Sequence, residues 1–279
     1  MKRIALPDEL NFSHSNSVAL FLYRSTTEIA RQQIILNKNT FSFLAEGSKE
    51  VFFDNSSYAI ENDQFLLMKS GHCLMTEKLS NTNRNYASIL LFFSNELALK
   101  FIRKYDIPKA YPKDTKSVFS FKYDSFIKKF VNSLSDIDLL PNRSKNHLLE
   151  IKFEEIMLYL SEIGYGACIR ALVDQNNDQR QKFTKTIESN QLNKLTIQEL
   201  AFLSNMSVST FKREFAKKYK ESPMKWFQNK RLEHAYRLMR DEQKRPSDIF
   251  FEVGYENLSS FVQAYKAKYG VTPKQHTST

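Results

Sequence analysis

The first third of the chain consists of short apolar segments separated by turn-forming residues. The segments are rich in β-branched and aromatic side chains, and Asn, Asp, Ser and Gly stand between them. We expect strands at Val18–Tyr23, Gln33–Leu36, Thr40–Ala45, Glu50–Phe53, Gln64–Lys69, Cys73–Glu77 and Ala87–Phe93. Short strands at this spacing predict an antiparallel sandwich or a small barrel.

Helical periodicity then replaces the strand pattern. Asn95–Lys104 and Tyr123–Leu134 are amphipathic, and Ser144–Ile163 has apolar residues near helical spacing without an interior Pro or Gly. Because apolar positions run nearly all round this third segment, we expect it either to be buried on several sides or to form a subunit interface. The pattern leaves both alternatives open. The residues assigned to a dimer interface are Leu149, Phe153, Ile156 and Leu160.

These changes of pattern predict an α+β chain with two domains. Residues 1–110 form the β-rich domain, and residues 111–173 form a helical dimerisation segment. Residues 174–185 are the expected linker, since the run Asp174–Gln181 is polar and lacks apolar periodicity. Residues 186–279 form an all-α domain.

The last part of the chain carries one pattern twice. Residues 207–223 read SVSTFKREFAKKYKESP, and residues 257–273 read NLSSFVQAYKAKYGVTP. Ser209 and Ser259, like Phe211 and Phe261, stand 50 positions apart. A repeated helix with an aromatic stripe and a polar, basic outer face predicts two DNA-reading helices.

The first copy fits a helix-turn-helix, whose second helix enters the major groove. Thr196 can cap the leading helix, and Asn205 tolerates the left-handed conformation of a tight turn. Ser207 or Ser209 can then cap the reading helix.

The second copy begins at Pro246, which suits a first helical turn, and Gly254 marks its turn. Ser259–Tyr269 is the second reading helix. Between the copies, Met224–Arg240 is predicted to be one continuous linker helix.

Helical geometry separates a core face from an outer face. Phe211 and Phe215, four residues apart, must face the core, as must Phe261 and Tyr265. The residues expected to contact bases are Ser209, Lys212, Arg213, Ser259, Val262 and Gln263. The residues expected to contact phosphates are Thr210, Lys217, Lys218, Ser260, Lys266 and Lys268.

The chemistry of these side chains suits base reading. Arg213 can form a bidentate pair with guanine, Gln263 with adenine, and Val262 can contact a thymine methyl group. The alternative is that each of them is only a solvated helix residue, and for Val262 and Ser259 the pattern does not decide.

Charge strengthens the nucleic-acid interpretation. The chain has a net charge of +10, and from Gln191 to the C-terminus 16 Lys and Arg residues stand against 9 Asp and Glu. A basic module attached to a nearly neutral one is typical of nucleic-acid binding. A solvated basic surface would give the same count.

Several function classes are unlikely on composition. Cys73 and Cys168 are far apart and form no CxxC pattern, so we expect neither a disulfide framework nor a zinc site. Of the five histidines only His72 falls among the expected strands, whereas a metal-dependent enzyme needs several converging ligands. We therefore expect no catalysis and no cofactor. The first residues lack a signal peptide and the apolar runs are too short to span a bilayer, so a cytoplasmic location is expected.

The C-terminal region resembles the DNA-binding domain of the AraC/XylS family of bacterial transcription regulators. The second copy matches the family motif at Ile249, Gly254, Tyr255, Ser259, Phe261, Tyr265, Lys266, Gly270, Thr272 and Pro273. The linker-helix signature matches at Arg231, Leu232 and Ala235. The first copy matches at Leu200, Ala201, Ser207, Ser209, Phe211, Arg213, Phe215, Ser222 and Pro223. Many spaced matches over about a third of the chain are far more specific than one short motif.

This resemblance implies a promoter-binding regulator of the activator kind. It implies a cupin-like N-terminal barrel that senses a small-molecule or protein effector, a homodimer, and RNA polymerase as a partner. Residues Ile151–Glu155 also resemble regulators of the type III secretion activator kind, whose first domain is governed by protein partners. The alternative function is a signal-sensing interaction module whose DNA-binding domain is weak or vestigial.

The chain departs from the family pattern at four positions. Phe250 stands where Ala is usual, Pro246 replaces Ile, Gln263 stands where Arg is frequent, and Asn205 where Gly is common. We expect these changes to affect base preference and the affinity of the second copy, while the fold is retained.

Overall fold

The structure is a computed structural model that describes residues 3–10, 17–53, 56–108, 116–138, 140–173 and 179–277. The chain divides into two compact units, Met1–Phe183 and Thr184–Thr279. Each unit has its own hydrophobic core, and each is described by itself.

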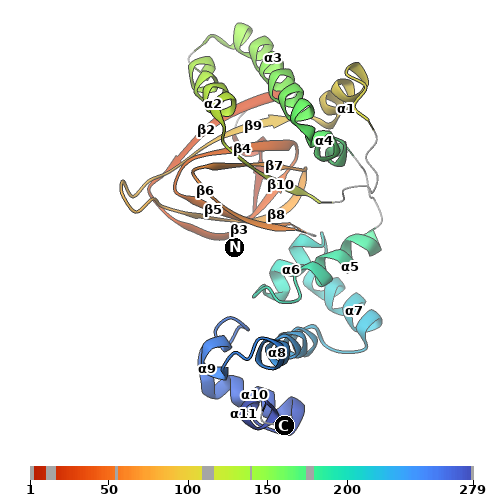
Figure 1. Cartoon of the computed structure of the whole chain (residues 1–279). Helices are drawn as coiled ribbons and strands as arrows, with labels where there is room; N and C mark the ends of the chain where they lie inside the picture. Colours follow the sequence, from red (N-terminus) through yellow and green to blue (C-terminus); the bar gives the residue numbers. More distant parts are fainter. Residues whose placement is uncertain are drawn as a thin grey trace. The chain divides into compact units, whose positions relative to one another are not determined.

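The first unit is built mainly from β-strands (Figure 1). The strands are β1 (Arg3–Leu6), β2 (Val18–Ser25), β3 (Ile29–Leu36), β4 (Asn39–Glu46), β5 (Ser48–Phe52), β6 (Ser57–Glu61), β7 (Gln64–Met68), β8 (Gly71–Lys78), β9 (Tyr86–Phe93) and β10 (Val118–Lys122). Its helical elements are η1 (Asp8–Leu10), α1 (Asn95–Lys104), α2 (Ser125–Asp138), α3 (Asn142–Leu160), the π-helical η2 (Ser161–Tyr165) and α4 (Gly166–Val173).

The strands form two five-stranded sheets that enclose a core. One sheet has the order β1-β3-β8-β5-β6, and the other has the order β10-β7-β4-β9-β2. Neighbouring strands are antiparallel except for β1, which pairs with β3 in parallel. The fold is therefore the expected β-rich N-terminal domain followed by a helical C-terminal domain.

Both faces of the second sheet are covered, so its strands bury apolar side chains on both faces. Side chains alternate between the faces of a strand, and on β4 Leu44 joins the core between the sheets while Phe41 and Phe43 face the other way. There they pack with Phe153 and Ile156 of α3. Helices α1–α4 cover this outer face of the sheet (Figure 1).

Three strands were not expected from the sequence. These are β1, β6 and β10, and β10 lies inside residues 111–173, which the sequence assigned to helices. Val118–Lys122 pairs with β7 along its whole length and closes the edge of the second sheet. The partner strand that stabilises β10 is about 50 residues away in sequence, so local patterning could not indicate it.

The predicted dimer-interface residues are part of the monomer core. Leu149, Phe153, Ile156 and Leu160 have exposed fractions of 0–1%. Their side chains pack with the second sheet and with α1, α2 and α4, so a second copy of the chain cannot reach them. Of the two alternatives for this helix, the structure supports core packing, and the assignment of these four residues to a dimer interface is corrected.

One helical stretch, Ser144–Val173, is long and apolar enough to cross a membrane, contrary to the expectation from apolar run lengths. Gly164 interrupts this stretch with a φ of 94°. The inward-facing side chains of the stretch belong to the core of the first unit. A core helix of a globular domain can have the same length and composition, and the packing of these side chains is that of a core helix.

The expected linker falls partly outside the described residues, which omit 174–178. From Gln179 onward the chain is helical, because Gln179–Ser189 forms α5. The boundary between the two units falls within α5, after Phe183.

The second unit is entirely helical among its described residues. Its helices after α5 are α6 (Ile197–Leu203), α7 (Val208–Tyr219), α8 (Pro223–Asp241), α9 (Pro246–Ile249), α10 (Leu258–Tyr269) and α11 (Pro273–Thr277). The expected linker helix is confirmed as α8, with Pro223 in its first turn.

Candidate DNA-binding surface

Helices α6 and α7 form the first helix-turn-helix. Thr196 caps α6 through a capping box: its Oγ1 accepts the Glu199 N–H at 3.2 Å, and the Glu199 carboxylate accepts the Thr196 N–H at 2.6 Å. Asn205 makes the turn with a φ of 54°. Ser207 then caps α7 by accepting the Thr210 N–H at 3.1 Å. Of the two serines proposed as the cap, Ser207 has this role.

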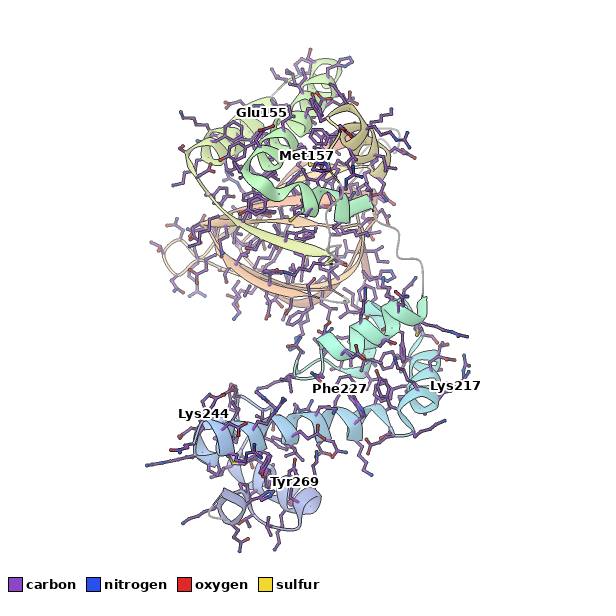
Figure 2. All side chains as sticks on the ribbon, turned by 45° about the vertical axis from the view of Figure 1, so that its right-hand side comes forward. Glu155, Met157, Lys217, Phe227, Lys244 and Tyr269 are labelled. Carbon is purple, nitrogen blue, oxygen red and sulfur yellow. The ribbon has the colours of Figure 1, made fainter. Side chains whose placement is uncertain are left out.

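The aromatic stripe of α7 holds this helix against α8. Phe211 and Phe215 are fully buried. The Phe215 ring centroid lies 5.6 Å from that of Trp226 and 5.8 Å from that of Phe227, both on α8. Figure 2 labels Phe227 on this helix. Since aromatic contacts fix one face of α7, the opposite face is left to solvent.

The exposed face of α7 carries the residues predicted to read bases. Ser209, Lys212 and Arg213 are exposed, and 71% of the Arg213 side chain is accessible. Arg213 Nε lies 3.4 Å from Glu214 Oε1, an exposed contact that a nucleic acid can replace at little cost. Lys217 is also exposed (Figure 2). The structure brings these side chains together on one helix face.

Two other residues expected to contact phosphates on α7 have partners within the unit. The Lys218 ammonium donates to Thr184 Oγ1, and the Thr210 hydroxyl accepts from Ser207. Lys218 is nevertheless exposed, whereas Thr210 is half-buried.

The second helix-turn-helix runs from α9 to α10. Gly254 makes its turn with a φ of 94°, and a Cβ there would lie 3.1 Å from Arg231 Cδ. Asn257 caps α10 by accepting the Ser260 N–H at 2.9 Å. Phe261 and Tyr265 are fully buried against α8, as expected.

The outer face of α10 is less basic than that of α7. Ser259, Ser260, Gln263 and Lys266 are exposed. Val262 is half-buried and packs against the core of this module, so part of its side chain is structural. The second reading helix thus presents mostly neutral polar groups.

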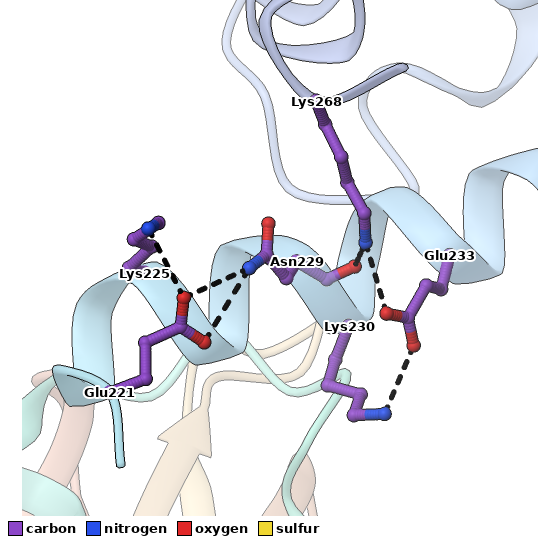
Figure 3. Close-up of polar contacts among 6 residues, drawn as sticks. All are labelled: Glu221, Lys225, Asn229, Lys230, Glu233 and Lys268. Atoms are coloured by element: carbon purple, nitrogen blue, oxygen red, sulfur yellow. Dashed lines mark hydrogen bonds and ion pairs between the residues drawn. The ribbon is translucent and has the colours of Figure 1, made fainter. Parts of the chain in front are cut away.

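Lys268 does not lie free for a phosphate. Its ammonium donates to the Asn229 carbonyl oxygen at 2.7 Å and to Glu233 Oε1 at 3.0 Å, both on α8 (Figure 3). Only 19% of the side chain is exposed. The assignment of Lys268 to phosphate contact is therefore corrected, because its ammonium donates to two acceptors within the unit.

Sequence reasoning missed the polar groups on α8 that receive Lys268. Lys230 donates to the second oxygen of Glu233 at 3.0 Å, and Glu221 accepts from Asn229 and pairs with Lys225 at 3.5 Å (Figure 3). Partial burial opposes ionisation of Glu233, but the hydrogen bonds from Lys230 and Lys268 outweigh it and lower the pKa of this carboxyl group. The spacing of Lys230 and Glu233 was the available signal, since residues three apart on a helix are neighbours.

Phe250, the largest departure from the family pattern, is half-buried at the edge of the second module. It packs against the cluster formed by Leu232, Ile249 and Phe261. The core therefore accommodates the ring at its margin.

The barrel of the first unit contains a buried ion pair. Lys49 Nζ lies 3.4 Å from Glu77 Oε1 and donates to Ser42 Oγ at 3.0 Å, and Lys49 is almost completely buried. Burial alone would lower the pKa of Lys49, but Tyr86 and Glu77 raise it above its ordinary value. Burial also raises the pKa of Tyr86 to about 12.

A pocket of 630 Å³ opens at the same end of the barrel. Its lining includes Arg24, Thr26, Glu46, Asn85 and Tyr86, from the ends of β2, β4 and β9. Within the described ranges no three His, Cys, Asp or Glu residues are grouped to hold a metal ion.

Two family models match the chain. The ExsA N-terminal regulatory domain matches residues 39–172, and a helix-turn-helix domain matches residues 200–278. The virulence regulon transcriptional activator VirF of Yersinia enterocolitica is 30% identical over 129 residues, which are 46% of this chain and 48% of VirF. The chain thus matches about half the length of this relative.

Two further similarities extend over most of the chain. The HTH-type transcriptional regulator ExsA of Pseudomonas aeruginosa is 21% identical over 233 residues, 83% of each chain. A crystal structure of apo ToxT from Vibrio cholerae covers 95% of this chain and 98% of that chain, at 13% identity and a TM-score of 0.44.

Proposed function

Because the chain belongs to the AraC/XylS family of bacterial transcription regulators, we propose that it is a sequence-specific DNA-binding activator. Its two reading helices, α7 and α10, enter two successive major-groove segments. The N-terminal unit controls this binding in response to a signal.

One observation supports this proposal above the others. Two capped helices, each the second of a helix-turn-helix, are attached through buried aromatic side chains to the same linker helix α8. Each leaves a polar face exposed, with Lys212 and Arg213 on the first and Gln263 and Lys266 on the second. Groups of this chemistry hydrogen-bond base edges and phosphates.

The test is to replace Lys212 and Arg213 by alanine together in the full chain. The probe is a duplex that the natural chain enriches from a random-sequence library, with binding measured at several salt concentrations. Loss of two side chains expected to contact bases should weaken binding by about 2 kcal/mol or more, which is about thirtyfold.

The matched control is the double change Lys100→Ala and Arg103→Ala on α1. It removes the same charge from two exposed positions on a helix of the first unit. A general electrostatic effect would weaken binding equally in both variants and would contradict the proposal. If the natural chain enriched no duplex, the alternative of a vestigial DNA-binding domain would be supported.

The partners are also proposals. VirF is named a transcriptional activator, which supports RNA polymerase as a partner of this chain. For the effector, a small molecule or a protein, the barrel-end pocket that includes Arg24 and Glu46 is a candidate site. For a homodimer, exposed apolar side chains of the first unit such as Ile151 and Ile163 are candidate contacts, since the core face of α3 is occupied. A cytoplasmic location fits contact with DNA.

A further inference from the structure

We propose that Lys268 is a positioning residue that fixes the second reading helix on the linker helix, and that this attachment makes the chain selective for the spacing between its two DNA segments. The inference depends on the proposed function, because it concerns how two reading helices share one duplex. Lys268, Asn229 and Glu233 are called the clamp below.

The clamp joins two helices that carry different tasks. Lys268 lies near the C-terminal end of α10, and its ammonium reaches across to α8. The Asn229 carbonyl oxygen and Glu233 Oε1 accept two of its hydrogen bonds, and Lys230 holds the other oxygen of Glu233 (Figure 3). A charge-assisted contact with two acceptors restricts both sliding and rotation of α10 along α8.

The position of Lys268 distinguishes it from its neighbour Lys266. Lys266 is exposed on the outer face of α10, whereas most of the Lys268 side chain is covered. Lys266 presents its side chain to solvent, where a phosphate can reach it. Lys268 turns its ammonium toward α8, so its contribution to DNA binding comes through the position of α10.

A second contact connects the two helix-turn-helix modules directly. Lys194, just before α6 of the first module, donates to the Phe251 carbonyl oxygen in the second module at 2.6 Å. Its ammonium also lies 4.1 Å from the centroid of the Phe251 ring, although 68% of Phe251 is exposed. A cation over the face of an aromatic ring adds a modest attraction at an exposed site. The modules are thus connected by α8 and by this bridge.

Two connections of this kind limit how the reading helices can follow a changed duplex. One inserted base pair moves the second segment by about 3.4 Å along the duplex axis and rotates it by about 35°. A chain with fixed modules must then deform the DNA or release one segment. Modules that are loosely connected can follow the changed spacing. They bind the natural spacing less well, because binding must then fix their relative position and this costs conformational entropy.

The experiment compares full-length variants on four duplexes. They are the library-enriched duplex, the same duplex with one inserted base pair between the segments, and duplexes in which either segment is scrambled. We expect Lys268→Met to bind the enriched duplex about tenfold more weakly than the natural chain does. The insertion penalty, which is the further loss of affinity caused by the inserted base pair, should fall to a few-fold in this variant. Binding to the duplex that retains only the first segment should be unchanged.

Lys266→Met is the matched control on the same helix. This variant should bind every duplex that α10 contacts more weakly. The salt dependence of its affinity should fall by about one released counterion, and the insertion penalty should not change. If Lys268→Met behaves in this way, Lys268 contacts a phosphate and the positioning role is overturned.

Glu233→Gln gives a test of opposite sign. Removal of a negative charge near DNA should strengthen binding by simple electrostatics, whereas loss of the clamp should weaken binding to the enriched duplex and reduce the insertion penalty. Stronger binding with an unchanged insertion penalty would contradict the inference. Fluorescence of Trp226, the one tryptophan of the chain, verifies that each variant retains its second unit.

Lys194→Met tests the bridge in the same assay. We expect a smaller insertion penalty without a change on the first segment alone. If the natural chain binds the enriched duplex but tolerates the insertion as well as its variants do, the spacing inference fails while the proposed function stands. If the natural chain enriches nothing, the proposed function fails first.

Discussion

Replacement of Lys49 by methionine should destabilise the barrel strongly. Lys49 and Glu77 are 1% and 6% exposed at their side chains, and their charged atoms are 3.4 Å apart. The second oxygen of Glu77 is buried without a hydrogen-bond partner within the described residues. After Lys49→Met, a buried carboxylate would remain with no opposing charge.

The size of the effect follows from the burial of both charged groups. Removal of one partner of a buried ion pair costs about 3–5 kcal/mol, because it leaves an uncompensated charge in the protein interior, so we expect a loss of about 4 kcal/mol.

The assay is hydrogen exchange of β5 and β8 peptides in increasing urea, which measures the opening free energy of the barrel. Trp226 fluorescence in the same samples monitors the second unit, which should be unchanged. The double change of Lys49 and Glu77 to methionine should recover most of the loss. A loss below about 1 kcal/mol, or a double variant as unstable as Lys49→Met, would refute the reasoning.

Three further predictions follow from the packing. The raised pKa of Tyr86 contributes stability that is complete below pH 10 and is lost as pH rises toward 12, so barrel unfolding measured by circular dichroism should begin in that range. Gly254→Ala should lower the melting temperature of the second unit more than Gly270→Ala, because both have positive φ but only Gly254 has close neighbours. Leu149→Ala should cost about 2–5 kcal/mol of folding stability and Ile151→Ala less than about 0.5, since Leu149 is buried and Ile151 is 61% exposed; equal effects in urea unfolding would contradict the core assignment.

The helix-turn-helix modules could be predicted closely because their signals are local. A capping threonine, a left-handed Asn205, a glycine turn and aromatic residues four apart each act within one or two helical turns. The same locality made the exposed face of α7 predictable, including Lys212 and Arg213. Helical periodicity alone places such residues opposite the buried stripe.

Contacts distant in sequence were the ones that could not be predicted. The strand β10 depends on β7, and Lys268 depends on acceptors of α8 that lie 35 and 39 residues earlier. The residues next to a lysine in the sequence do not show whether its ammonium is exposed or held by another helix. The difference arises only when another helix supplies an acceptor.

The sequence by itself determined the α+β composition, the doubled reading module and the basic outer face of α7, because periodicity, capping and charge are properties of short segments. Tertiary structure alone decided that the apolar faces of α3 meet a sheet instead of a second copy, and that Lys268 turns inward. The physical reason is the same in both cases. An apolar or charged side chain specifies the kind of partner it requires, and only the folded chain decides which partner comes within reach.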